Sequence, residues 1–173
     1  MVITQYGGPN GELGASLRYL SQRYTMPDEV SKGLLTDIGT EELAHLEIVG
    51  SLVAQLSKNA PPKEWSEMGS WEYYSDNGAS VFPQSSQGSP FNAASIAVTG
   101  DPLTNLYEDL AAEQKARAVY DNILKLSDDP DVNKVIKFLR QREVVHFQRF
   151  GEAILTHSNR FGGYIACVKM QFI

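Results

Sequence analysis

Apolar residues recur every three or four positions along four stretches of the chain, a spacing that places them on one face of an α-helix. Three of these stretches are well defined and run from about 27 to 58, from about 103 to 126, and from 132 to 150. A weaker one runs from about 10 to 24, and Pro27 forces a break after it. The pattern therefore predicts four helices.

The connections between these helices differ greatly in length. The turn Ser127–Asp131 joins the third helix to the fourth, and so short a turn makes the two antiparallel neighbours. Asp101 and Pro102 suit the start of the third helix, because proline is favoured at the first helical position. The segment 59–102, between the second and third helices, is rich in Pro, Gly and Ser and far too long for a hairpin loop.

One long crossover between two helical hairpins is the connectivity of a ferritin-like bundle. The sequence therefore predicts an all-α, ferritin-like four-helix bundle over residues 1–157, followed by a C-terminal tail, 158–173. In the tail, alternating residues 164–168 suit a short strand. We expect aromatic side chains to anchor the crossover or to form a subunit contact: Trp65, Trp71, Tyr73, Tyr74 and Phe82.

Composition narrows the class of protein. A chain of 173 residues with 42% hydrophobic residues fits one soluble domain, and no apolar run approaches a membrane span. The net charge of -6, without a cluster of Lys and Arg, argues against a nucleic-acid partner. The single cysteine, Cys167, and an N-terminus without the regions of a secretory signal favour a cytoplasmic location.

Ionisable residues occupy helix faces that should be apolar. Glu42 and His45 lie on the core stripe of the second helix, and Glu143 and His146 repeat the same Glu-x-x-His pattern on the fourth. A spacing of three puts both side chains of each pair on one helix face. Glu113 lies on the core stripe of the third helix.

Several buried carboxylates on facing helix stripes would prevent folding unless a large positive charge compensated them. A pair of divalent metal ions supplies that charge. Two Glu-x-x-His helices plus one Glu from each remaining helix form the ligand layout of carboxylate-bridged dimetal bundles, and Glu12 opens the first helix. Carboxylate and imidazole ligands without a nearby cysteine suit manganese or iron.

Each member of this set has an ordinary alternative. A single Glu-x-x-His pair is common on exposed helix faces, and Glu12 could simply be an acidic residue favoured by the helix dipole. Near the site motif, Glu41 and Glu47 are expected on the solvent side, and His157 at the surface. Two further sets are expected to have structural roles only: Glu108 and Asp109 stabilise a helix start, and Lys115, Arg117, Arg140 and Arg142 are solvated or form salt bridges.

The combined motifs resemble those of the manganese catalases, in particular their short spore-coat relatives. The resemblance covers about residues 5–152 and rests on six runs: 7–12, 17–20, 37–45, 100–102, 109–113 and 142–146. It implies two manganese ions, with iron as the alternative. The implied ligands are Glu12, Glu42, His45, Glu113 and His146, with Glu42 bridging both ions.

The resemblance also implies functional roles for residues outside the ligand set. Glu143 is then hydrogen-bonded near the bridging solvent and acts as a proton shuttle, and Tyr19 lies close enough to Glu12 to hydrogen-bond to it. The implied reaction is disproportionation of hydrogen peroxide to water and dioxygen. Homo-oligomers, often hexamers, and a spore-coat location are implied as well.

Two rival functions remain at this point. A ferroxidase or iron-handling diiron bundle would use Glu143 as a sixth ligand and dioxygen as substrate. A structural protein, such as a spore-coat component, would use the metals mainly to hold the bundle together.

Overall fold

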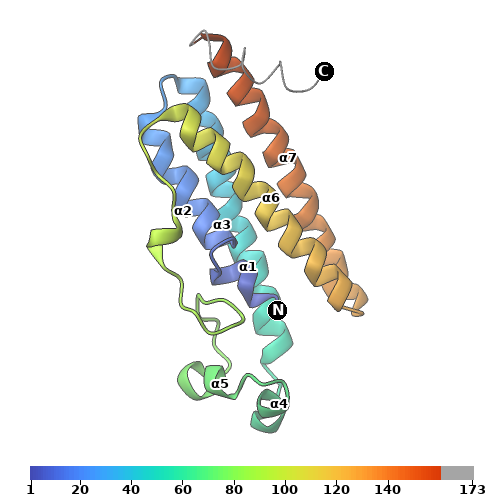
Figure 1. Cartoon of the computed structure of the whole chain (residues 1–173). Coiled ribbons are helices and arrows are strands. Elements are labelled where there is room, and N and C mark those ends of the chain that lie inside the picture. Colours follow the sequence, from blue (N-terminus) through green and yellow to red (C-terminus); the bar gives the residue numbers. More distant parts are fainter. Residues whose placement is uncertain (161–173) are drawn as a thin grey trace, which may run out of the picture.

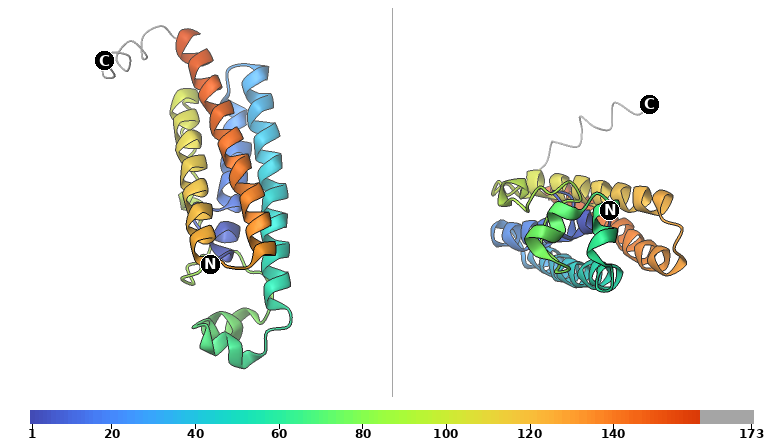
Figure 2. Two further views of the ribbon diagram at one scale, coloured as in Figure 1. Left: turned by 90° about the vertical axis from the view of Figure 1, so that its right-hand side faces the viewer. Right: turned by 90° about the horizontal axis from the view of Figure 1, so that it is seen from below.

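Four helices lie side by side in the computed structural model of the chain, which describes residues 1–160 (Figure 1). They are α2 (Glu12–Gln22), α3 (Glu29–Ser57), α6 (Pro102–Leu126) and α7 (Pro130–Arg160). α2 packs against α3, α6 packs against α7, and the two hairpins lie face to face (Figure 2). This confirms the predicted all-α, ferritin-like four-helix bundle with one crossover between its second and third helices.

Five short helical segments complete the part of the chain that the structure describes. They are α1 (Ile3–Gly7), η1 (Arg23–Thr25), α4 (Pro62–Glu67), α5 (Trp71–Asn77) and η2 (Ala93–Ser95). None was predicted, because one or two turns are too few for apolar spacing to reveal a helix. No helix within residues 1–160 combines the length and apolar character needed to cross a membrane.

Side-chain caps fix where the bundle helices begin. The Asp28 side chain accepts a hydrogen bond from the backbone N–H of Ser31 at 2.9 Å, and Asp101 accepts one from Thr104 at 2.7 Å. Such caps satisfy N–H groups that have no partner inside the helix. Pro102 follows Asp101 at the first helical position, as predicted.

The crossover first forms a small unit beyond the end of α3 and then returns along α2 (Figure 1). In that unit Trp65 is buried, stacks on Tyr73 with ring centroids 5.8 Å apart, and donates its indole N–H to the carbonyl of Ala60. Trp65 thus packs within the crossover itself, whereas Trp71 is exposed, and the anchoring of the linker to the bundle stays a prediction.

The returning part of the crossover is fastened to α2 by polar side chains. Arg18 donates from Nη2 to the carbonyl oxygen of Ser95 at 3.0 Å, and Gln22 donates to that of Ala97 at 2.7 Å. Because Arg18 and Gln22 are themselves buried, these bonds hold the crossover tightly against the bundle.

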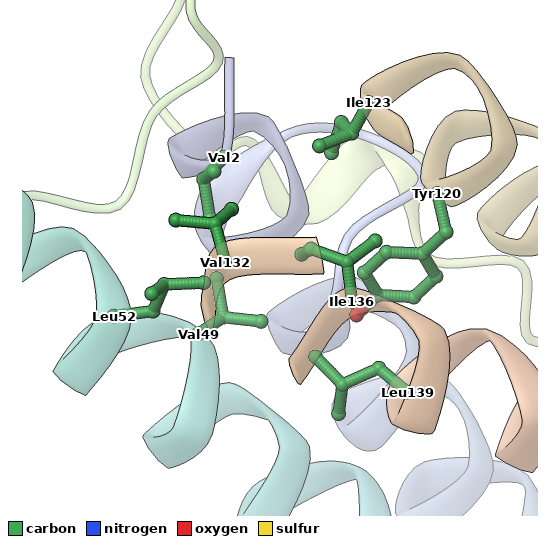
Figure 3. Close-up of a cluster of buried hydrophobic side chains, with 8 residues drawn as sticks. All are labelled: Val2, Val49, Leu52, Tyr120, Ile123, Val132, Ile136 and Leu139. Atoms are coloured by element: carbon green, nitrogen blue, oxygen red, sulfur yellow. The ribbon is translucent and has the colours of Figure 1, made fainter. Parts of the chain in front are cut away.

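The hydrophobic core is divided into two clusters along the bundle. One cluster, shown in Figure 3, comprises Val2, Val49, Leu52, Tyr120, Ile123, Val132, Ile136 and Leu139. The other comprises Ala15, Tyr19, Met26, Leu35, Ile38, Leu106, Phe150 and Ile154. On α3, Ile38 belongs to one cluster and Val49 to the other, and the Glu-x-x-His motif lies between them. The charged residues therefore occupy the middle of the bundle.

The prediction that His157 lies at the surface was wrong. Its side chain is 1% exposed, and its Nε2 lies 2.6 Å from the hydroxyl oxygen of Ser31. His157 follows Phe150 by seven residues and Ile154 by three, so it continues the buried stripe of a helix that extends to Arg160. The strand expected at 164–168 lies outside the described residues.

Replacing Ile136 by Ala tests the cluster of Figure 3. Ile136 is fully buried there, and removing its side chain should lower the free energy of unfolding by about 2–5 kcal/mol, since a cavity replaces packed atoms. Chemical denaturation of metal-free protein measures this change. Lys137→Ala, at an exposed position of the same helix, should change it by less than about 0.5 kcal/mol. Equal effects of the two substitutions would contradict the assigned core.

Candidate metal centre

Six ionisable side chains meet in the layer between the two hydrophobic clusters. Each is at most 2% exposed, and all four bundle helices contribute: Glu12 from α2, Glu42 and His45 from α3, Glu113 from α6, and Glu143 and His146 from α7. Helical spacing predicted five of these residues to face the core, and the resemblance added Glu12; the structure brings all six together.

Potential ligand atoms of these residues form two overlapping groups. Glu12, Glu42, His45 and Glu143 place one such atom each within 4.8 Å of one another. Glu42, Glu113, Glu143 and His146 do the same. Glu42 and Glu143 belong to both groups, so each lies where two metal ions could share it.

The hydrogen bonding of the cluster fits metal binding. Among the described residues, these buried atoms have no hydrogen-bond partner: Oε2 of Glu12, Oε1 of Glu42, Oε2 of Glu113, Oε1 of Glu143, and both ring nitrogens of His146. His146 Nδ1 and Glu42 Oε1 are only 2.7 Å apart, yet they lack the orientation of a hydrogen bond. Buried polar atoms without partners are costly, and divalent cations would satisfy them. Carboxylate oxygens and imidazole nitrogens are ligands that manganese and iron accept.

Both imidazole rings are turned the same way. His45 Nδ1 lies 2.8 Å from Glu42 Oε2, and His146 Nδ1 faces the other oxygen of Glu42. The two rings are stacked, with centroids 5.6 Å apart. Nδ1 of each ring could therefore bind a metal ion, while Nε2 points away from the carboxylate cluster toward Glu41.

Glu41 was expected on the solvent side of the motif, and that prediction was wrong. Its carboxylate is only 28% exposed and lies 3.5 Å from His45 Nε2 and 3.1 Å from His146 Nε2. Glu41 precedes His45 by four residues, a spacing that places the two side chains next to each other on a helix. That spacing could have revealed the contact.

Arg142 forms a salt bridge with Glu41, as expected for one of the basic residues. Its Nε lies 2.6 Å from Oε1 of Glu41, and its Nη2 lies 3.2 Å from Oε2. Burial opposes the charge on Glu41, but the hydrogen bonds of Arg142 and the proximity of His146 outweigh it and lower the pKa of this carboxyl to about 2.

Two buried tyrosines hold the outer carboxylates. The hydroxyl of Tyr19 donates to Oε1 of Glu113 at 2.6 Å, and the hydroxyl of Tyr120 donates to Oε1 of Glu12. The prediction that Tyr19 bonds to Glu12 was wrong, because seven residues carry it about 10 Å along α2, where it faces α6 instead. The apolar pattern alone gave no reason to connect Tyr120 with the site.

The two tyrosines complete an internal repetition of the site. Each hairpin supplies a Glu, a Tyr seven residues later, and a Glu-x-x-His pair, and each Tyr bonds to the Glu of the other hairpin. The repeated spacing, Glu12 to Tyr19 and Glu113 to Tyr120, could have identified both tyrosines. Even Glu41 and Arg142 occupy matching positions, each directly before the Glu of its pair.

Without metal, the surroundings of the buried carboxylates favour their protonated forms. Burial raises the pKa of Glu12, Glu42 and Glu143, and repulsion from neighbouring carboxylates, Glu113 among them, raises it further. Burial lowers the pKa of His45. Burial also opposes the charge on His146, but Glu113 and Glu42 outweigh it and raise the pKa of His146 to about 11.

Asp109 is a further buried carboxylate close to the centre. It was expected to stabilise the start of a helix, but it lies two turns inside α6, one turn before Glu113, and is fully buried. Burial raises its pKa well above the usual range, against the opposing effects of Gln22 and Arg18. The earlier interpretation of Asp109 was therefore wrong.

The fold and the site together define a four-helix-bundle protein with a candidate dimetal centre of carboxylates and imidazoles. A family model described as manganese containing catalase matches residues 1–168. Protein CotJC of Bacillus subtilis (strain 168) is 52% identical over 153 residues, which cover 88% of this chain and 80% of that protein. A probable manganese catalase of Clostridium acetobutylicum is 39% identical over 150 residues, covering 87% and 67% respectively.

A solved structure agrees with these relatives. KatB, a manganese catalase from Anabaena, superposes with a TM-score of 0.82 and 31% sequence identity, covering 91% of this chain and 70% of that one. The chain belongs to the manganese-containing catalase family.

Removing one tyrosine hydroxyl should affect one side of the centre more than the other. In Tyr120→Phe, Glu12 loses the donor that orients it, and the affinity of the metal position next to Glu12 should fall roughly 10–100-fold. In Tyr19→Phe, the affinity of the metal position next to Glu113 should fall by a similar factor. Calorimetric metal titration measures both, with the half-exposed Tyr107→Phe as control. If each substitution weakened both positions equally, the assignment of one tyrosine to one carboxylate would be wrong.

The metal-free protein should lose stability as pH rises. Folding raises the pKa of four groups: Glu12, Glu42, Glu143 and His146. Such groups stabilise the fold fully at pH values below their ordinary pKa, which is 4.5 for Glu and 6.5 for His. This stabilisation is lost as they deprotonate at higher pH. The thermal midpoint measured with chelator should therefore fall between about pH 5 and 8.

Bound metal replaces these protons, so the stabilisation by metal should increase over the same interval. Thermal unfolding at matched pH values, with and without metal, compares the two forms. A metal-free midpoint that stays constant or rises from about pH 5 to 8 would contradict the raised pKa values.

Proposed function

We propose that the protein is a dimanganese catalase that converts two molecules of hydrogen peroxide into two of water and one of dioxygen. The observation that carries this proposal is the convergence of four glutamates and two histidines in a buried layer of the bundle. Membership of the manganese-containing catalase family supports the choice of metal and substrate.

We assign five residues as ligands. Glu12 and His45 would hold one manganese ion, Glu113 and His146 the other, and Glu42 would bridge the two. The two overlapping groups of ligand atoms, which share Glu42, support this assignment. When bound, the ions supply the redox chemistry, since each peroxide exchanges two electrons and each manganese can change by one.

Glu143 acts in this proposal as the proton carrier. Its carboxylate is buried, belongs to both groups of ligand atoms, and has an oxygen 3.8 Å from Nδ1 of His45. It would deliver protons when the O–O bond of one peroxide breaks, and accept protons from the peroxide that is oxidised to dioxygen.

The surrounding residues keep the centre dry and fixed. Tyr19 and Tyr120 each hold one oxygen of an outer carboxylate, which leaves the other oxygen directed into the cluster. The hydrophobic clusters on either side exclude bulk water, and this strengthens electrostatic interactions within the site.

One observation favours a second function. Because Glu143 offers an oxygen to both groups, it could serve as a sixth ligand, as in a diiron ferroxidase that uses dioxygen. In that case the protein as isolated would contain iron, and removal of the Glu143 carboxylate would release metal.

We also propose that the protein forms a homo-oligomer. Exposed apolar side chains on the outer face of the bundle support this, among them Phe138 and Val144, which are 50% and 45% exposed.

The proposed reaction is tested by elemental analysis of the purified protein and by oxygen release from peroxide. We expect two manganese ions per chain and one dioxygen for every two peroxides consumed. Protein reconstituted with iron serves as the comparison. Iron in the isolated protein would support the ferroxidase function. If manganese-loaded protein released no oxygen from peroxide, the catalase proposal would be refuted and a structural role of the metals would be supported.

Glu143→Gln separates the two roles of this residue. The substitution preserves size but removes the titratable carboxyl, so we expect both metals to remain and turnover to fall at least 100-fold. Glu152→Gln, at an exposed position of the same helix, should leave both unchanged. Full turnover in Glu143→Gln would refute the proton-carrier role, and loss of metal would instead identify Glu143 as a ligand.

A further inference from the structure

A single carboxylate, that of Glu41, lies next to both histidines of the centre. Oε1 of Glu41 lies 3.5 Å from Nε2 of His45, and Oε2 lies 3.1 Å from Nε2 of His146. The histidines belong to different helices, α3 and α7, and each faces a different oxygen of Glu41. The two proposed metal positions therefore share one neighbour outside the ligand set.

Glu41 is itself held in place from α7. Arg142 binds it through two nitrogens, at 2.6 and 3.2 Å, which is the paired geometry of a guanidinium and a carboxylate. α3 and α7 make far fewer contacts with each other than either makes with its hairpin partner. The Glu41–Arg142 pair joins these two helices at the level of the centre.

A histidine that binds metal through one ring nitrogen usually donates the other N–H to a carboxylate, carbonyl or water. This second bond fixes the tautomer, orients the ring and makes the ligating nitrogen more basic. In this chain one carboxylate, Glu41, lies within 3.5 Å of Nε2 of both rings, so its loss should affect both metal positions together.

We propose that Glu41 is a positioning residue that orients both histidine ligands at once and thereby links the affinities of the two metal positions. Arg142 holds Glu41 in the required geometry. The inference rests on the proposed dimetal centre, but it does not depend on the reaction that the metals perform.

Two substitutions of Glu41 give different expected results. Glu41→Ala removes both acceptor oxygens, so the affinities of both positions should fall together, by roughly 10–100-fold. Glu41→Gln leaves a single acceptor oxygen, so one position should stay near its original affinity while the other falls. Arg142→Gln should weaken both positions by a smaller factor. Glu47→Gln, at an exposed position of the same helix, is the matched control.

The experiment is a manganese titration followed by calorimetry, together with release of manganese to a chelator and the paramagnetic resonance signal of the coupled ion pair. The resonance signal reports how the ligands are oriented. If the Glu41–Arg142 salt bridge were purely structural, its removal would leave this signal unchanged. Circular dichroism and thermal unfolding of the metal-free variants show that each still folds.

The inference is overturned if Glu41→Ala binds manganese at either position within twofold of the unaltered protein, or if it weakens one position alone. Oxygen release by the unaltered protein is measured alongside. A protein that binds two manganese ions but releases no oxygen would refute the proposed catalase reaction and leave the role of Glu41 to be decided by the titration.

Discussion

The structure depends on one electrostatic constraint, the burial of four carboxylates and two imidazoles in the middle of a helical bundle. Such a layer is unfavourable by itself, because the charged groups lose their hydration and the carboxylates repel one another. The protein meets this constraint locally. Burial raises the pKa of Glu12, Glu42 and Glu143, which favours their protonated forms when no metal is bound, and divalent cations fit the atoms left without partners. The hydrophobic clusters on both sides provide the packing that the polar layer cannot.

The site is built twice, once by each hairpin, and the two copies exchange contacts. Tyr19 of the first hairpin binds the outer glutamate of the second, and Tyr120 of the second binds that of the first. The repetition is not complete, since Glu41 and Arg142 occupy matching positions with opposite charges. That difference allows the two helices to attract each other across the centre, where identical charges would repel.

Much of this could be predicted from the sequence, because helical spacing is a local property. Pairs three or four residues apart must share a face, so Glu42 with His45 and Glu143 with His146 followed from the pattern, as did the four helices. Contacts between helices were harder to predict, because the partner of Tyr19 depends on which helix lies opposite α2 at that level. The burial of His157 depended on how far α7 continues, which the apolar pattern alone left open.

The ring of Tyr120 packs among the residues of Figure 3, while its hydroxyl binds Glu12. One side chain therefore belongs both to the packing of one end of the bundle and to the geometry of the centre. Any repacking that shifts this ring by a fraction of an ångström also shifts a carboxylate. An engineer who wished to make the protein more heat-resistant through this end of its core would have to keep the ring in place, or else accept an altered centre.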